Sequence, residues 1–405
     1  MRIAMVSEHA SPLADPGGPD AGGQNVHVRE LSRALAAAGH EVTVFTRRDD
    51  PHRPEIVPMQ PGVTVRHVLA GPARPIPKDD ILGHIPDLAR GLEESWRAEP
   101  PDIVHAHFWM SGRAAATAAR ALDLPLVQTF HALGCVKRRH QGPADTSPDA
   151  RIPAERQLTR RVDRVIATCE DELFELIRTG APRGRVSIVP CGVDTVDFSP
   201  DGPALPRGDR PRLVSIGRLV RRKGVDEVVT ALAAVPGAEL LIAGGPAEAT
   251  LDPDTVRLRE LTARHGVSDR VRFLGAVPRA EVPALLRSAD AVVCAPWYEP
   301  FGIVALEAMA CERAVVATAV GGMQDTVVHG VTGLHVPPRS PNALAAALRD
   351  LLSDPKLPTA FGRAGRARVM ARYAWTRVAA ATERVYEDVL NERIGTTARA
   401  AGGVR

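Results

Sequence analysis

The sequence has little cysteine, few aromatic residues and no long apolar run. Its cysteines are odd in number and scattered without the spacing of zinc ligands, so neither a zinc site nor a disulfide framework is expected. No apolar run approaches the roughly 20 residues that span a bilayer. The opening residues, Met-Arg-Ile-Ala-Met-Val, match a strand and not a signal peptide. We therefore expect a cytoplasmic protein without a transmembrane segment.

Positive and negative charges are nearly balanced. The 51 basic and 48 acidic residues leave a net charge of +3, so nucleic acid is not an expected partner. Lysine is rare and occurs only at positions 78, 137, 223 and 356. A local exception to the balance is the basic run Lys137-Arg138-Arg139-His140, which a solvated loop explains equally well.

Short apolar strands alternate with helical patterns along the whole chain. A length of 405 residues suits two domains of roughly 200 residues each. The alternation predicts an α/β fold in which each half forms a largely parallel, doubly wound sheet. The expected strands are 3–7, 42–46, 63–69, 103–106, 126–130, 165–168 and 186–189 in the first half, and 213–216, 240–243, 271–274, 291–295, 315–317 and 334–336 in the second.

A segment rich in proline and glycine separates the two halves. This linker, residues 198–211, divides a first domain at 1–197 from a second at 212–374. Ligands of such sheets bind beyond the carboxyl ends of the strands, where loops lead into helices. We therefore expect the functional site in a cleft between two Rossmann-like domains.

The remaining segments are a final helix, a tail and two loops. The last amphipathic helix is expected at 375–392, and the Ala/Gly/Thr/Arg-rich tail at 393–405 is expected to be disordered. Proline-rich stretches at 47–62 and 71–79 are expected to be loops.

Two charged motifs follow strands of the second half. Arg218 and Lys223 come just after its first strand, and a guanidinium with an ammonium can together hold a diphosphate. Glu299 lies in a loop, Gly302 opens a helix, and Glu307 lies inside that helix. Carboxylates accept hydrogen bonds from sugar hydroxyls, while freed N–H groups at a helix start bind anionic oxygens. Each motif alone is more often a solvated cap or surface charge, but together they predict a nucleotide-sugar site.

The patterns Glu-x7-Glu, at positions 299 and 307, and Arg-x4-Lys, at 218 and 223, resemble the signatures of the retaining glycosyltransferases of family 4. The resemblance covers nearly the whole chain. It implies the GT-B fold, with two Rossmann-like domains facing a cleft and a final helix that crosses back onto the first domain.

The same resemblance implies how the donor is bound. Arg218 and Lys223 would stabilise the leaving diphosphate, Glu299 would bind hydroxyls of the transferred sugar, and Glu307 would bind the ribose. Val277 aligns with the segment that contacts the base, although an ordinary core position explains it equally well. The remaining donor contacts implied are Gly23, Gly244, Phe301, Gly302, Ile303 and Val304.

Two features of the first half complete the expected site. Gly22 and Gly23 open the first long helix, where a backbone N–H could approach a phosphate. His107 and His131 end neighbouring strands. A single histidine there is more often structural, but two favour function. By resemblance His131 contacts the transferred sugar and belongs with Arg218, Lys223 and Glu299 in the catalytic set.

The stretch around Asn25 and the run His107-Phe-Trp-Met-Ser-Gly resemble the branch that contains inositol-phosphate N-acetylglucosaminyltransferases and sucrose-phosphate synthases. Phe108 replaces a tyrosine of that branch and Ala132 a threonine, which removes two polar contacts. The acceptor is therefore a phosphorylated cyclitol, an unphosphorylated one as in antibiotic assembly, or another sugar or lipid-linked glycan. The acceptor contacts implied are Asn25, Lys78, His107, Phe108 and Arg151.

The expected chemistry needs no cofactor. No Asp-x-Asp metal motif sits at a strand end, and GT-B enzymes use basic groups and helix starts instead, so metal-independent catalysis is expected. A covalent intermediate would need a carboxylate nucleophile, and the family shows no consistent candidate. The hypothesis is front-face substitution, in which the departing diphosphate takes the acceptor proton. The expected donor is a UDP-sugar in preference to an ADP- or GDP-sugar, and the expected assembly, if the chain self-associates, is a homodimer.

Other classes of function compete with a glycosyltransferase. A GT-B protein can be a nucleotide-sugar epimerase, a phosphorylase or a non-catalytic binding module. A phosphorylase needs a pyridoxal-phosphate lysine, for which only Lys223 and Lys356 are available in the second half. A dinucleotide oxidoreductase is disfavoured because no Gly-x-Gly-x-x-Gly turn follows the first strand.

Overall fold

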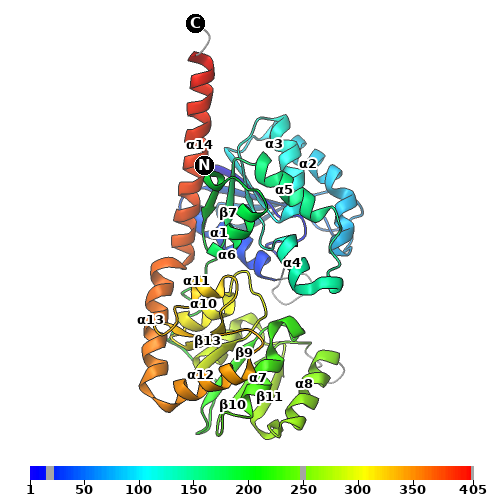
Figure 1. Cartoon of the computed structure of the whole chain (residues 1–405). Helices are drawn as coiled ribbons and strands as arrows, with labels where there is room; N and C mark the ends of the chain where they lie inside the picture. The colour runs from blue at the N-terminus through cyan, green and yellow to red at the C-terminus, as the bar shows by residue number, and fades with distance from the viewer. Residues whose placement is uncertain (15–21, 247–251, 403–405) are drawn as a thin grey trace. The chain divides into compact units, whose positions relative to one another are not determined.

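A computed structural model gives the structure of residues 1–14, 22–246 and 252–402 (Figure 1). It divides into two units. The first unit comprises Met1–Pro190 together with the segment that starts at Trp375, and the second comprises Cys191–Ala374. Phe198, at the start of the expected linker, is buried in the core of the second unit.

The sheet of the first unit has the strand order β3-β4-β2-β1-β5-β6-β7-β8. β3 pairs antiparallel with β4, and the other neighbours pair in parallel. The central strands are short apolar runs buried on both faces, as parallel sheets require. Their bounds are β1 Arg2–Val6, β2 Glu41–Arg47, β3 Ile56–Gln60, β4 Val63–Val68, β5 Ile103–His107, β6 Leu126–Thr129, β7 Arg164–Ala167 and β8 Val186–Ile188.

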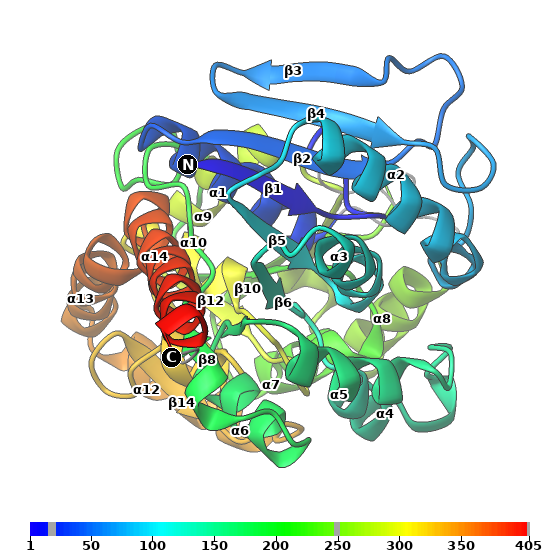
Figure 2. The same ribbon diagram turned by 90° about the horizontal axis from the view of Figure 1, so that it is seen from above.

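Helices cover both faces of this sheet. α2, α3 and α5 lie on one face, whereas α1 and the C-terminal helix α14 pack together on the other (Figure 2). The helices are α1 Gly23–Ala37, α2 Ile85–Ala98, α3 Trp109–Ala121, α4 Gly134–Gln141, α5 Arg151–Arg161, α6 Glu170–Arg178 and α14 Trp375–Gly402, with short 3-10 segments η1 Lys78–His84, η2 Gly142–Ala144 and η3 Arg183–Arg185.

The second unit has a parallel sheet in the order β11-β10-β9-β12-β13-β14. Side chains alternate between its faces, so Leu213 packs with α7, α8 and α12, whereas its neighbour Val214 packs with α9, α10 and α13. The strands are β9 Arg212–Ile216, β10 Glu239–Ala243, β11 Val271–Gly275, β12 Ala291–Cys294, β13 Ala314–Thr318 and β14 Gly333–Val336. The helices are α7 Val225–Leu232, α8 Pro253–Arg264, α9 Val282–Arg287, α10 Ile303–Ala310, α11 Met323–Thr326, α12 Pro341–Ser353 and α13 Lys356–Arg372, with η4 Arg221–Lys223, η5 Ser268–Arg270 and η6 Arg279–Glu281.

Two segments differ from the expectation. Residues 47–62 are not all loop, because Ile56–Gln60 forms the edge strand β3. Pro58 is tolerated there because an edge strand leaves one side of its backbone unpaired. The segment from 393 is also not disordered as far as Gly402, since α14 continues through it. Alanine and arginine favour a helix that is already nucleated on the first unit. Residues 403–405 lie outside the described residues.

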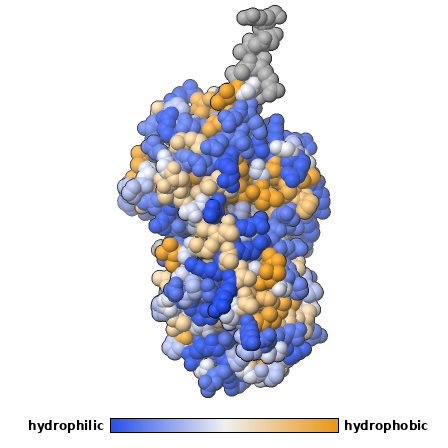
Figure 3. Space-filling model, turned by 90° about the vertical axis from the view of Figure 1, so that its left-hand side faces the viewer, coloured by the Kyte–Doolittle hydropathy of each residue, from blue (hydrophilic) through white to orange (hydrophobic). Residues whose placement is uncertain are grey.

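The surface carries scattered apolar side chains. On the face in Figure 3, hydrophilic and apolar residues interleave, as is usual for folded proteins. Within the described ranges, no helix has the length and apolarity needed to cross a membrane.

Candidate active site

In the second unit, Arg218 and Lys223 lie on the turn between β9 and α7. Gly224, which ends this turn, has φ 67°, and a Cβ there would lie 1.8 Å from the carbonyl oxygen of Ala295 after β12. Only glycine permits such an approach of two backbones. The turn is thereby fixed at the carboxyl end of the sheet, with Arg218 exposed and Lys223 half-buried.

The next two loops lie at the same end of the sheet. Gly244, after β10, has φ 140°, and a Cβ there would lie 1.9 Å from the carbonyl oxygen of Gly217. Val277, after β11, is half-buried and packs against the same apolar cluster as Val304. Val277 therefore has a core role in the second unit, whether or not a base also contacts it.

Glu299 forms an ion pair with Lys223. Burial alone would raise the pKa of Glu299, but the charge and hydrogen bond of Lys223, together with the charge of Arg222, lower it below its usual value. The pKa of Arg222 is itself lowered by burial and by the neighbouring Arg218. Three cations thus accompany one ionised carboxylate. The surplus of positive charge suits an anionic ligand such as a diphosphate.

The helix α10 begins at a glycine. Gly302 is its N-cap with φ 73°, and a Cβ there would lie 2.9 Å from Sδ of Met323. The half-buried residues Ile303 and Val304 form the first turn, where N–H groups lack partners within the helix. Phe301, also half-buried, precedes the glycine. The backbone here can therefore donate to an anionic ligand.

Glu307 is buried one turn into α10. Its carboxylate pairs with Arg279 of η6, whose guanidinium also lies over the ring of Phe198 at 4.4 Å from the centroid. Burial raises the pKa of Glu307 above its usual value, and Arg279 offsets part of this shift. Arg279 did not stand out in the sequence, because nothing in its immediate neighbours indicates that it reaches a carboxylate 28 positions away.

In the first unit, Gly23 and Asn25 lie in the first turn of α1. Gly23 is the first residue of the helix, so its N–H belongs to those without a partner inside it. The Asn25 side chain accepts a hydrogen bond from Gly22 N–H at 3.0 Å and donates one to Ser11 carbonyl oxygen at 3.0 Å. Asn25 is buried and caps its own helix, and both of its side-chain hydrogen bonds described above go to backbone groups, not to another predicted acceptor residue.

Lys78, Phe108 and Arg151 come together. The Lys78 ammonium lies 4.1 Å from the centroid of the Phe108 ring, and the Arg151 guanidinium lies 5.0 Å from it. Phe108 has φ 78°, an outlier for a bulky residue and of the kind found at ligand sites. Burial and the positive charge of Arg151 lower the pKa of Lys78 to about 8. Lys78 makes no ion pair within the described part of the chain.

Arg151 is held rigidly. Its Nε donates to Glu155 at 2.8 Å, and Glu155 also accepts from the Gly134 N–H at 2.8 Å. Ser147 accepts hydrogen bonds from Arg151 at 3.2 Å and from Lys137 at 2.9 Å. Lys137 belongs to the basic run at 137–140, which lies on α4 and not in a loop. Two of its cations form ion pairs, Lys137 with Asp145 and Arg139 with Glu175.

Two further side chains border this group. Glu8, directly after β1, is buried and bonded to His9 at 2.6 Å and to Ser111. Burial would raise its pKa, but His9 and Ser111 bring it below the usual value. The His9 ring lies 4.9 Å from that of Phe108. The end of the first strand is the sequence signal that could have indicated Glu8.

His107 and His131 meet at the ends of β5 and β6. Nδ1 of His107 lies 3.0 Å from Nε2 of His131, and both rings are buried. The rings of His27 and His105 lie next to them. Burial drives the pKa of His107 and of His131 well below the usual value. Within the described ranges, no group of three or more His, Cys, Asp or Glu side chains is arranged to hold a metal ion.

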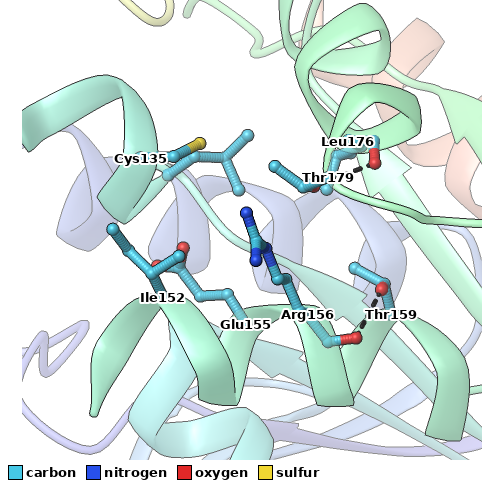
Figure 4. Close-up of a pocket in the computed structure, with 8 residues that line it drawn as sticks. Cys135, Ile152, Glu155, Arg156, Thr159, Leu176 and Thr179 are labelled. Atoms are coloured by element: carbon cyan, nitrogen blue, oxygen red, sulfur yellow. Dashed lines mark hydrogen bonds between the residues drawn. The ribbon is translucent and has the colours of Figure 1, made fainter. Parts of the chain in front are cut away.

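A small pocket lies between α4, α5 and α6. Figure 4 shows Arg156 and Glu155 reaching into the space beneath Cys135. None of the predicted site residues lines this pocket. Its link to them is indirect, because Glu155 also bonds Arg151.

Two family models match the chain. The model described as "Glycosyltransferase Family 4" matches residues 21–197, and that described as "Glycosyl transferases group 1" matches residues 202–368. Together with the two parallel α/β units, these matches define a glycosyltransferase with the GT-B fold, as the sequence predicted. The chain belongs to glycosyltransferase family 4.

Similar proteins place the chain more closely. It is 38% identical to the D-inositol 3-phosphate glycosyltransferase of Kineococcus radiotolerans, with 97% of this chain and 96% of the relative covered. It is also 38% identical to the protein of that name in Xylanimonas cellulosilytica, with 97% and 98% covered. The solved sucrose-phosphate synthase of Thermosynechococcus elongatus has a TM-score of 0.87 at 33% identity, covering 96% of this chain and 99% of that one. The predicted likeness to this branch is confirmed.

Proposed function

We propose that the protein transfers a hexose or N-acetylhexosamine from a UDP-sugar to a hydroxyl of D-inositol 3-phosphate or a closely similar phosphorylated cyclitol. Transfer retains the anomeric configuration, needs no metal ion and takes place in the cytoplasm. The observation that carries the choice of acceptor is Lys78, a cation without an ion-pair partner among the described residues that lies beside Arg151. The names of the relatives at 38% identity support the same choice.

The environment of Lys78 favours an anion. Its pKa of about 8 reflects burial and repulsion by Arg151, which the charges of Glu8 and Asp79 offset only in part. A phosphate held by Lys78 and Arg151 would relieve that repulsion and raise the pKa of Lys78. A neutral cyclitol would leave the repulsion in place.

The second unit is proposed to bind the donor. Arg218 and Lys223 hold the diphosphate, and the first turn of α10 donates N–H groups to it. Glu299, kept ionised by Lys223, accepts hydrogen bonds from hydroxyls of the transferred sugar. Glu307 binds the ribose hydroxyls, so Arg279 shares or yields this carboxylate when the nucleotide enters.

The proposed chemistry is front-face substitution. The bond between the anomeric carbon and the diphosphate oxygen breaks, and the acceptor oxygen bonds to that carbon on the same face. The acceptor proton passes to the departing phosphate oxygen, which balances the charge of the step. Arg218 and Lys223 stabilise the negative charge that develops on the leaving group.

The test is transfer from UDP-, GDP- and ADP-sugars to D-inositol 3-phosphate, with and without EDTA. We expect a UDP-sugar to be used, EDTA to have no effect, and NMR of the product to show the anomeric configuration of the donor. Myo-inositol without phosphate should be used at least tenfold less well, since one charged contact alone contributes about this factor. An inverted product or loss of activity in EDTA would contradict the corresponding part of the proposal.

An unphosphorylated cyclitol is the second candidate. It is favoured by Phe108 and Ala132, which lack the hydroxyl groups found at these positions in the phosphate-binding branch. Transfer to myo-inositol or an aminocyclitol at least as efficient as transfer to the phosphorylated acceptor would select this candidate.

A further inference from the structure

Trp297, in the loop after β12, is bonded to the turn that carries Lys223. Its indole Nε1–H donates a hydrogen bond to the Glu227 carboxylate at 3.0 Å, and its backbone N–H donates to the Arg222 carbonyl oxygen at 2.8 Å. Arg222 directly precedes Lys223, and Glu227 lies in the first turn of α7, which follows it. The loop that leads to Glu299 is therefore bonded to the turn on both sides of the lysine.

This tie between two loops matters because the ion pair of Lys223 with Glu299 joins two side chains. The ammonium of a lysine sits on a flexible four-carbon stem, so its position depends on the backbone that carries it. Gly224 already brings the end of the turn against the carbonyl oxygen of Ala295, where only glycine fits. The indole of Trp297 adds a second fixed point, in the first turn of α7.

Arg339, between β14 and α12, restrains the indole. Its guanidinium carbon lies 4.0 Å from the centroid of the Trp297 ring, within the range of a cation–π contact. Its backbone has φ 55°, a conformation that residues other than glycine rarely adopt. Its side chain is exposed and forms no ion pair within the described part of the chain. Stacking on Trp297 is therefore what orders this guanidinium, and the contact holds the ring where Nε1 reaches Glu227.

We infer that Trp297 is a positioning residue for the donor, which through Glu227 and Arg222 holds the turn of Lys223 against the loop of Glu299. The inference rests on the proposed function in assigning the donor diphosphate to Lys223. Trp297 acts through the lysine and makes no contact with the donor in this role. A cation that stabilises a leaving group is effective only when its support is rigid, because small displacements weaken the interaction.

The direct test of the contact is the indole N–H signal of Trp297 in ¹H–¹⁵N spectra, assigned with Trp297→Phe. We expect a proton shifted downfield, as in a hydrogen-bonded indole. Glu227→Ala should move this signal upfield, whereas Glu227→Gln, which keeps an acceptor oxygen, should leave it close to its original position. A signal that does not respond to Glu227→Ala would overturn the inference.

The link to Lys223 is tested by a double-mutant cycle on the Kd of UDP. Trp297→Phe keeps an aromatic ring and the backbone hydrogen bond but loses Nε1–H, and it should weaken UDP binding about fivefold, the effect of one hydrogen bond. In a Lys223→Ala background the same change should weaken binding less than about twofold, because Trp297 acts through the lysine. Losses that add in full would mean that Trp297 has only a structural role, and would overturn the inference.

Variants of the partner residue give the controls. Glu227→Ala should weaken UDP binding as much as Trp297→Phe, and Glu227→Gln should bind like the unaltered protein. Glu260→Ala removes an exposed carboxylate from α8 of the same unit and should change neither the indole signal nor the Kd. Loss of UDP binding in Glu227→Gln equal to that in Glu227→Ala would contradict the proposed hydrogen bond.

The two ideas can fail separately. Losses in UDP binding that do not add, in a protein that transfers no sugar, would leave the positioning role standing and overturn the proposed function. Sugar transfer by a protein in which the losses of Trp297→Phe and Lys223→Ala add would do the reverse. A protein that binds no UDP would overturn both.

Discussion

The polar groups at the strand ends of the second unit are charged, whereas the imidazoles at the strand ends of the first unit are neutral. In the second unit Glu299 is ionised despite burial because Lys223 is its partner. In the first unit His107 and His131 are packed against other imidazoles, so a charge on either ring would meet repulsion in addition to desolvation. The difference shows that burial alone does not remove charge, and that the neighbouring groups decide.

Lys78 lies between these extremes. It is a cation in the same unit as the neutral imidazoles, and its pKa of about 8 places it near the point of losing its charge. In the proposed function, the second unit therefore supplies fixed charges that bind the diphosphate. The first unit supplies neutral hydrogen-bond donors for the acceptor, together with Lys78, whose charge depends on pH.

The largest effect is expected from the fixed charges. Arg218→Ala and Lys223→Ala should each lower kcat about 10²–10³-fold, the typical effect of removing one group that stabilises transition-state charge. Arg218 is exposed, so its loss leaves no buried carboxylate behind. Lys356→Ala, which removes an exposed lysine of the same unit, is the control and should be unchanged. Losses of only a few-fold, measured in proteins with normal thermal unfolding, would deprive the proposed mechanism of its electrostatic basis.

The second-largest effect is expected from Lys78, on the KM of the acceptor. Lys78→Ala should raise the KM of D-inositol 3-phosphate about 10- to 100-fold, since a hydrogen bond to a charged group is lost. The KM of unphosphorylated inositol should change little. Arg138→Ala removes an exposed cation of the same unit and serves as the control. A uniform loss for both acceptors would show that Lys78 does not select phosphate.

Acceptor binding should depend on pH where donor binding does not. The pKa of Lys78 is lowered in the free protein and would rise when phosphate binds, so affinity is complete below the free value of about 8 and is lost as the pH rises through it. The acceptor KM should be about tenfold higher at pH 9 than at pH 7. Lys78→Arg, which does not titrate in this range, should remove the dependence. A donor KM that rises in parallel would contradict the division between the units.

The smallest effect is expected at Glu307. Burial raises the pKa of this carboxyl, and Arg279 opposes the shift, so Arg279→Ala should raise the pKa further. A group with a raised pKa loses its charge as the pH falls through that value. The donor KM of Arg279→Ala should therefore increase a few-fold, more at pH 5.5 than at pH 7.5. Arg264→Ala, at the exposed end of α8, should behave like the unaltered protein, and an unchanged donor KM in Arg279→Ala would argue against Glu307 as the ribose ligand.

Much of the fold could be predicted from local patterns. Each buried strand is a short apolar run followed by a helix. This order predicts a parallel sheet, because the connecting helices are what cover both of its faces. β3 was missed because Pro58 and its polar neighbours indicate a loop, whereas an edge strand tolerates both. The tail was mispredicted because composition cannot show that α14 already docks against α1.

In the candidate site, the sequence could predict mainly the residues that come shortly after a strand. The loops after β9 and β12 bring Lys223 and Glu299 together, and both residues were singled out because each follows an apolar strand. Arg279 and Tyr386 were missed because their contacts with Glu307 and His105 join positions far apart in sequence. Asn25 was predicted to bind the acceptor, but its side chain bonds backbone groups near its own helix start. The sequence does not show whether an amide at a helix start bonds the backbone or a ligand.

The polypeptide passes from the first unit to the second and returns at Trp375, so the first unit cannot be completed during synthesis until the whole of the second unit has been made. Trp375 packs edge-on against His27, and Tyr386 bonds His105, so α14, which follows the second unit in the sequence, completes the packing of the buried histidines of the first unit. The ribosome must therefore synthesise α14, after the whole of the second unit, before this core is closed to water. A nascent or truncated chain that stops before α14 would therefore present open, protonatable imidazoles, and quality-control proteases could distinguish it from the finished enzyme.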